Sequence, residues 1–213
     1  MDKRKKGLFI FILLLLALAA IYFFGIGGAS ASRYVQYQHP ELGFVLPVPE
    51  SWSLTKETQD AAAWQSENGD FALLVMGQLG GYSYYNMTGM GNIMATLLQE
   101  SISQWQEVSR EQRKDLPKCY RIKGQGLDSE GNPVITDGLI LEPMQAVRFY
   151  VIGIGGPEQY KEYSDFLEDV YDGFDVVLSA DEIYEVMMEW KEEQATENEP
   201  LPEGLDDSGS TDG

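Results

Sequence analysis

Two kinds of hydrophobic pattern follow one another along the chain. Residues 8–24 are seventeen consecutive apolar side chains, and no charged residue lies between Gly7 and Ser32. A helix of about twenty residues is about 30 Å long, which matches the hydrocarbon core of a bilayer. From residue 33 onward, short apolar runs alternate with polar residues, as in a globular domain. We therefore expect residues 7–29 to form a transmembrane helix that precedes a folded domain.

Alternation with a period of two residues predicts an antiparallel set of strands in this domain. Asn68-Gly69 is a strong signal for a hairpin turn, and it separates residues 62–65 from residues 70–76. Because residues 71–76 are all apolar, they are expected to form a central strand. Further strands are predicted over residues 33–38, 44–49, 108–114, 118–127, 134–142 and 146–154.

Apolar residues at helical spacing predict three helices. The first covers residues 92–105, and the second covers residues 158–171 and ends at Gly173. The third begins after Ser179, because Ser179 and Glu182 have the spacing of a capping box. It continues to about residue 193 and carries an apolar stripe of Ile183, Val186, Met187 and Trp190.

These elements predict an α+β fold class, with an antiparallel sheet and packed helices over residues 33–178. Phe44 and Trp52 are expected in its core. The amphipathic helix over residues 179–193 follows, and residues 194–213 are rich in Glu, Asp, Pro, Gly and Ser. That composition cannot bury enough apolar surface to offset the entropy of ordering, so it predicts a disordered acidic tail.

The net charge of −19 is unevenly distributed. Residues 1–6 carry +3, residues 33–180 carry −11 and residues 181–213 carry −11. Clustered Lys and Arg before a membrane helix remain in the cytoplasm, so the domain is predicted to be extracytoplasmic. An acidic domain has no electrostatic reason to bind nucleic acid or anionic lipid headgroups.

The sequence leaves open whether the N-terminal helix is retained. Ala29-Ser30-Ala31 fits a signal-peptidase site, and cleavage after Ala31 would release a secreted protein. The apolar run is longer than that of a usual signal peptide, which favours a single-pass anchor in the cell membrane.

Few residues are suited to catalysis or metal binding. His39 is the single histidine and Cys119 the single cysteine, which excludes an internal disulfide and most histidine chemistry. Cys119 is expected to be half-buried in a strand. Residues 128–132 predict a hairpin turn and not a calcium loop, because the twelfth position from Asp128 is Leu139 instead of glutamate. The acidic residues within 165–172 are expected on a solvated helix face. No catalytic residue, metal ligand or cofactor is predicted, although a carboxylate pair assembled across strands is left open.

The most unusual segment covers residues 80–91, which are rich in Gly, Tyr and Met. Such side chains form adaptable amphipathic surfaces that are used in binding, and the alternative is that they pack onto the sheet edge. The apolar stripe of the third helix has the same two alternatives, docking on the domain or on a partner. The candidate partner-binding residues are Tyr82, Tyr84, Tyr85, Met87, Met90, Ile183, Met187 and Trp190.

The order of elements, together with several aromatic, Pro and Gly positions, resembles the PsbP-like fold. This family includes the extrinsic photosystem II subunit, a Ran-binding import factor of yeast and many bacterial envelope proteins. The resemblance covers residues 33–178 and implies an antiparallel sheet with packed helices, but no functional residue is carried over from it, because one fold serves unrelated tasks. The closing pair Gly173-Phe174 departs from the family's Ser-Phe. The residues that carry the resemblance are Tyr37, Gly43, Phe44, Pro49, Trp52, Phe166, Gly173 and Phe174.

The favoured interpretation is a non-enzymatic, membrane-tethered extracytoplasmic domain that binds a protein or an envelope component. One alternative is an envelope hydrolase whose carboxylate site assembles on folding. The other is a structural accessory subunit of a membrane complex that acts through its anchor helix or its C-terminal apolar stripe.

Overall fold

The computed structural model describes residues 33–79, 87–113, 119–144 and 147–179, together with residues 181, 182, 184, 185 and 188. The predicted cytoplasmic flank (1–6), transmembrane helix (7–29) and acidic tail (194–213) lie outside these residues. Within the described part of the chain, no helix is both long enough and apolar enough to cross a membrane.

The domain contains two antiparallel sheets and two long helices, so the α+β prediction is confirmed. The large sheet has seven strands in the order β3-β4-β5-β9-β8-β7-β6, and the small sheet has the order β1-β2-β10. The strands are β1 (Tyr34–Gln38), β2 (Phe44–Pro49), β3 (Ser53–Thr58), β4 (Ala61–Gln65), β5 (Phe71–Leu79), β6 (Ser103–Arg113), β7 (Cys119–Leu127), β8 (Pro133–Met144), β9 (Val147–Gly155) and β10 (Asp175–Val176), and the helices are α2 (Met87–Ser101) and α3 (Pro157–Gly173).

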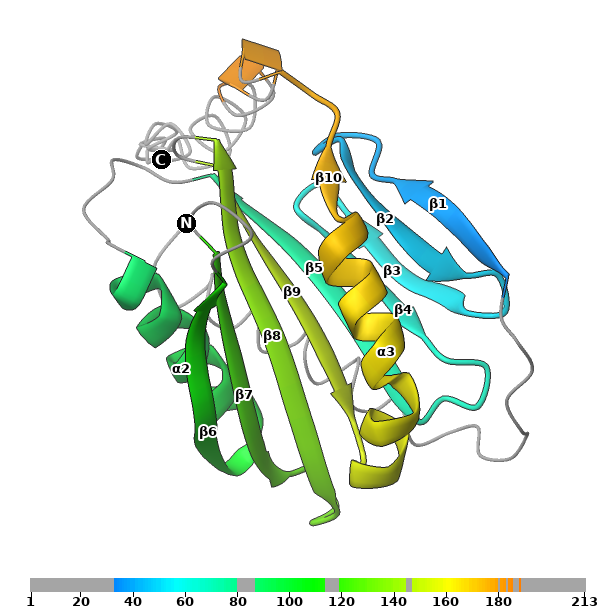
Figure 1. Cartoon of the computed structure of the whole chain (residues 1–213), viewed down its shortest axis with the longest axis vertical. Coiled ribbons are helices and arrows are strands. Elements are labelled where there is room, and N and C mark those ends of the chain that lie inside the picture. The colour runs from blue at the N-terminus through cyan, green and yellow to red at the C-terminus, as the bar shows by residue number, and fades with distance from the viewer. Residues whose placement is uncertain are drawn as a thin grey trace, which may run out of the picture.

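The large sheet has a different cover on each face (Figure 1). Helix α2 packs on one face through an apolar cluster that includes Met94, Leu98 and Ile102. Helix α3 and the small sheet pack on the other face through a second cluster, which contains both Phe44 and Trp52. Phe44 is fully buried and Trp52 is 8% exposed, so the expectation that both belong to the core is confirmed.

Two predicted turns form as the sequence indicates. Asn68-Gly69 lies in the hairpin between β4 and β5, where Gly69 has a φ of +74° that a glycine adopts without strain. The Asp128 side chain accepts hydrogen bonds from the backbone N–H of Glu130 and of Asn132, both at 2.8 Å, and so closes the turn between β7 and β8. Burial acts to raise the pKa of Asp128, but the hydrogen bonds from Asn132, Glu130 and Gly131 outweigh it and lower the pKa.

The capping box after α3 is also confirmed. The Ser179 N–H donates to Glu182 Oε2 at 2.8 Å, and the Glu182 N–H donates to Ser179 Oγ at 3.3 Å. The backbone is helical at Asp181, Glu182, Tyr184, Glu185 and Met188. A helix therefore starts where the sequence predicts it.

The first predicted helix is displaced. It was expected over residues 92–105, whereas α2 covers Met87–Ser101 and β6 begins at Ser103. Leu98, Ile102 and Trp105 have helical spacing, but α2 ends at Ser101, and Gln104, which has a φ of +54°, already lies within β6. Trp105 belongs to β6, and its indole N–H donates to Thr136 Oγ1 at 2.9 Å.

Candidate functional site

Helix α3 covers only part of its face of the large sheet. It packs mainly against β2, β9 and β8, while β7 and β6 lie beside it without a helix above them (Figure 1). We call the residues of β6, β7 and β8 that point to this side, from the edge of α3 outward, the open strip. The cross-strand register places them on one face: Gln106, Ser109, Glu111 and Arg113 of β6, Arg121, Lys123, Gln125 and Leu127 of β7, and Pro133, Ile135 and Asp137 of β8.

Asp137 anchors the strip at the edge of α3. Its side chain is fully buried. Arg121 donates to both carboxylate oxygens, through Nε at 2.8 Å and through Nη2 at 2.6 Å. The Tyr160 hydroxyl donates to Oδ2 at 2.7 Å, the Tyr171 hydroxyl donates to the Asp137 backbone carbonyl at 2.8 Å, and Lys123 Nζ lies 3.4 Å from Oδ2. These contacts join α3 to β7 and β8 through one residue, Asp137.

The groups around Asp137 are held in fixed protonation states. Burial acts to lower the pKa of the Arg121 guanidinium, but the hydrogen bonds and the charge of Asp137 raise it on balance. Burial, followed by the charge of Asp137, raises the pKa of Tyr171 well above its ordinary value. Burial is also the main cause of the raised pKa of Tyr160. The guanidinium therefore remains charged and both hydroxyls remain donors over a wide pH range, which suits a structural anchor.

Acidic residues of α3 pair with the outer strands. Arg113 Nη2 lies 2.7 Å from Asp172 Oδ1, and Arg113 Nη1 lies 3.5 Å from Glu168 Oε2. Glu168 also forms an ion pair with Arg121 Nη1. Two of the acidic residues expected on a solvated helix face are therefore partners of arginines. In the part of the chain that the structure describes, no group of three or more His, Cys, Asp or Glu side chains is arranged to hold a metal ion.

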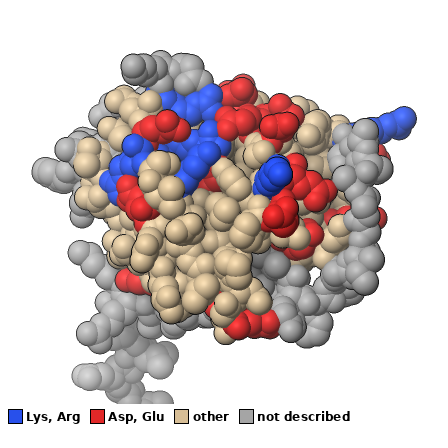
Figure 2. Space-filling model, turned by 60° about the horizontal axis from the view of Figure 1, so that its bottom comes forward, with Lys and Arg blue, Asp and Glu red and all other residues tan. Residues whose placement is uncertain are grey.

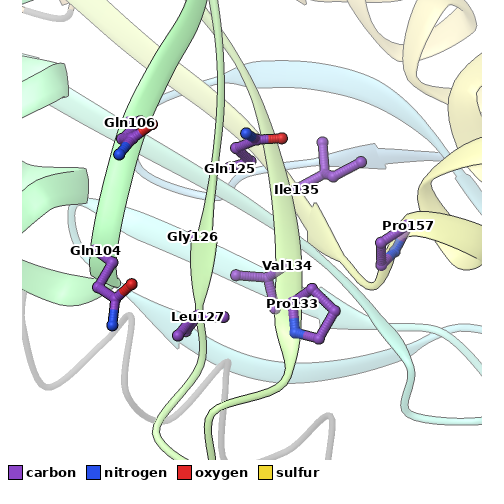
Figure 3. Close-up of a pocket in the computed structure, with 9 residues that line it drawn as sticks. All are labelled: Gln104, Gln106, Gln125, Gly126, Leu127, Pro133, Val134, Ile135 and Pro157. Atoms are coloured by element: carbon purple, nitrogen blue, oxygen red, sulfur yellow. The ribbon is translucent and has the colours of Figure 1, made fainter.

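An uncharged groove lies at the end of the strip near the start of α3 (Figure 3). Its volume is about 480 Å³. Viewed from the lower end of Figure 1, cationic and anionic side chains lie close together on one part of the surface, and a broad area beside them carries no charge (Figure 2). The groove is lined by Gln104, Gln106, Gln125, Gly126, Leu127, Pro133, Val134, Ile135 and Pro157.

A bulge in β6 shapes one wall of the groove. The pairing of β6 with β7 shifts between Ser103 and Gln106, and Gln104 is the one non-glycine residue in the described ranges with a positive φ. Beyond the shift, Gln106 is paired with Gln125, which in turn is paired with Ile135. The predicted turn at 128–132 implies the pairing of Gln125 with Ile135. Gln106 is missed because its strand is predicted to begin only at residue 108, whereas β6 begins at Ser103.

Among the candidate binding residues predicted from the sequence, Met90 is the one whose side chain lies in the described part of the chain. Tyr82, Tyr84, Tyr85, Ile183, Met187 and Trp190 lie outside the described residues, as does the side chain of Met87. Met90 is fully buried between α2 and the sheet, so its assignment to an exposed binding surface is wrong. The reason is that α2 begins at Met87, which places Met90 one turn before Met94 on the buried side of the helix.

The single cysteine and the single histidine both have structural positions. Cys119 lies in a strand, β7, as expected, but it is fully buried and not half-buried. His39 is also buried, its Nδ1 accepts the backbone N–H of Leu42 at 3.0 Å, and its Nε2 lies 2.9 Å from the Thr58 carbonyl oxygen. The ring therefore closes the turn between β1 and β2.

Neither a family model nor a curated protein sequence matches the chain. Solved structures do resemble it. The Ran-binding protein Mog1p of Saccharomyces cerevisiae matches with a TM-score of 0.52 and 6% identity, over 69% of this chain and 97% of Mog1p. The cyanobacterial PsbP of Synechocystis matches with a TM-score of 0.52 and 12% identity, over 72% of this chain and 98% of that protein. At such identities the likeness concerns the fold alone, and the fold of this chain is PsbP-like, as the sequence predicted.

Proposed function

We propose that this protein is a membrane-tethered extracytoplasmic accessory domain that binds another protein through the open strip. The observation that carries the proposal is the combination of exposure and rigidity in β6 and β7. Ser109, Glu111 and Gln125 are exposed beside α3, while the Arg121–Asp137 network fixes the strands on which the strip is built. A preorganised surface loses little conformational entropy on association, which favours binding.

The same network argues against an enzyme that would use Asp137. Both oxygens of its carboxylate accept hydrogen bonds from Arg121, and one of them also accepts the Tyr160 hydroxyl. A general acid or base needs a free position toward substrate. Binding therefore accounts for the strip better than the alternative of an envelope hydrolase at this carboxylate.

The tether and its orientation are supported by the sequence of the N-terminal segment. Residues 8–24 are uninterrupted apolar side chains, and Lys3 to Lys6 precede them. A reporter enzyme that is active only in the cytoplasm, fused after Gly213, is expected to be silent. The control is the same fusion without residues 1–31, which is expected to be active. Strong activity of the full-length fusion would contradict the proposed topology.

Site-specific crosslinking tests the strip. A photoreactive amino acid is placed at Ser109 or at Glu111 in the full-length chain and irradiated in native membranes. Both positions are expected to give the same protein adduct. The control position is Thr96, which is exposed on α2 on the opposite side of the sheet. An adduct from Thr96 without one from either strip position would refute the proposal.

A further inference from the structure

The groove differs in chemistry from the rest of this acidic protein. None of its nine lining residues is charged or aromatic, although the chain has a net charge of −19. Three lining residues carry carboxamides, and Leu127, Pro133, Ile135 and Pro157 supply apolar side chains, while the side chain of Val134 is buried in the cluster on the α2 side. Its volume of about 480 Å³ lies within the range of natural ligand sites.

This lining excludes several kinds of ligand. A phosphate or a carboxylate would need cationic or N–H donors aimed at it, and a metal ion would need anionic or imidazole ligands. Nucleobases bind by stacking on aromatic rings, which the groove does not contain. A carboxamide has two N–H donors and a carbonyl acceptor, which is the same pair of functions that a peptide group presents.

The carboxamides are placed in a row across the strands. Gln106 of β6 is paired with Gln125 of β7, and Gln125 is paired with Ile135 of β8. Gln104 lies beside this row, because the bulge holds its backbone at a φ of +54°. Such a conformation is costly for a residue with a side chain and persists where the surroundings impose it. Here the surroundings are the buried Trp105, hydrogen-bonded to Thr136, and the end of α2.

We propose that the groove binds an extended, uncharged peptide segment of the partner protein. This inference rests on the proposed function and names the chemistry that the lower end of the open strip recognises. The three carboxamides hydrogen-bond to backbone groups of the segment, and its apolar side chains pack on Leu127, Ile135 and Pro157. Acidic segments are repelled by the net charge of the domain, and basic segments find no counter-ion among the lining residues.

Fluorescence polarisation with the full-length chain in detergent tests this proposal. The probes are three labelled synthetic peptides of about eight residues, which span about 25 Å when extended. One alternates Val with Thr and Asn, and the others replace the polar positions with Glu or with Lys. The neutral peptide is expected to bind with little dependence on salt, because no ion pair is formed. Binding of the Lys peptide alone, lost at high salt, would overturn the proposal.

Matched variants assign the binding to the groove. Gln125→Glu is nearly isosteric and introduces a negative charge at an exposed position of the groove. It is expected to weaken neutral-peptide binding about tenfold or more. The control is Gln112→Glu, which adds the same charge to β6 on the face opposite the strip, since Gln112 is paired with Tyr120. It is expected to change the affinity less than about twofold. Equal affinities for these two variants would overturn the proposal.

Gln104→Gly separates a binding role from a structural one. Glycine adopts a positive φ without strain, so the melting temperature is expected to rise, while loss of the carboxamide is expected to weaken peptide binding. A variant that is more stable and binds equally well would contradict a role for Gln104 in recognition. If the peptide binds but no adduct forms from Ser109 or Glu111, the open strip fails as the protein interface while the groove stands as a peptide site.

Discussion

The two faces of the seven-stranded sheet are covered to different extents. On the α2 side, β7 contributes Ile122, Gly124 and Gly126, and a single helix covers an almost wholly apolar surface. On the α3 side, the alternate residues of the same strand include Cys119, Arg121 and Gln125, which pass from fully buried to exposed along the strand. The α3 side is thus a core at one end and an open surface at the other.

Strand β8 shows where the change occurs. Its α3-facing residues are Leu141 and Leu139 in the core, then Asp137, then Ile135 in the groove. Asp137 is buried at the place where apolar cover ends, and its carboxylate is tolerated there because Arg121 and Tyr160 donate hydrogen bonds to it. The comparison teaches that a single charged network forms the boundary between the core and the candidate binding surface.

Alkaline pH is expected to have the largest effect, and it acts mainly on the α3 side. Burial is the main cause of the raised pKa of Tyr34, Tyr37, Tyr160, Tyr163 and Tyr171 there, and for Tyr163 the value reaches about 12. The unfolded chain releases these protons near pH 10, while the folded protein retains them, so stability is full below about pH 10 and falls as pH rises above it. Denaturant unfolding monitored by circular dichroism from pH 8 to about pH 12 measures this loss. Unchanged stability across that range would contradict it.

Trp52→Ala is expected to reduce the free energy of unfolding by about 3–5 kcal/mol, because it opens a cavity in the covered part of the α3 side. The Trp52 ring lies 4.7 Å from that of Phe166, 5.4 Å from that of Tyr163 and 5.8 Å from that of Phe71, measured between centroids. Leu54→Ala is the control, since Leu54 is 44% exposed, and its effect is expected to stay below about 1 kcal/mol. Chemical denaturation compares the two variants, and equal losses would show that Trp52 does not occupy a packed core.

Asp137→Asn tests the boundary itself and is expected to cost about 3 kcal/mol. The substitution keeps the shape of the side chain but leaves the buried guanidinium of Arg121 without its fully buried counter-ion. The cost lies at the lower end of the usual range, because Glu168 remains as a second partner of Arg121. Glu111→Gln is the control: Glu111 is paired with Arg121 across the strands but is exposed. Similar free energies of unfolding for the two variants would show that Asp137 does not have this structural role.

Gly124→Ala compares the two faces at neighbouring positions of one strand. A Cβ on Gly124 would meet the indole ring of Trp105, which is buried and hydrogen-bonded, so a loss of about 1–3 kcal/mol is expected. Gln125→Ala, on the open side, is expected to stay within about 0.5 kcal/mol of the parent protein. Thermal unfolding of both variants measures the difference, and a tolerant Gly124 would show that Trp105 can move.

The sequence predicts the covered elements better than the open strip. Residues 158–171 show clear helical spacing and form α3, and Trp52 and Phe44 are correctly placed in the core. The groove could be predicted only in part, because the sequence places Gln104 in the helix over residues 92–105 and Gln106 before the strand predicted over residues 108–114, whereas both belong to β6. The helical spacing of Leu98, Ile102 and Trp105 continues past the end of α2 at Ser101, so the sequence does not show where the helix gives way to β6.

Glu168→Gln is expected to have the smallest effect, at most about 1 kcal/mol, although Glu168 pairs with both Arg113 and Arg121. Its side chain is 45% exposed, so water screens both ion pairs, and Arg121 keeps its two hydrogen bonds to Asp137. Because the lost term is electrostatic and partly exposed, the effect should shrink as the ionic strength rises from about 0.01 M to about 1 M. That of Asp137→Asn should persist, because its charges are buried. Urea unfolding of both variants at the two ionic strengths measures the contrast. A loss for Glu168→Gln as large as that for Asp137→Asn, and independent of salt, would show that the boundary network extends to the surface of α3 and does not end at Asp137.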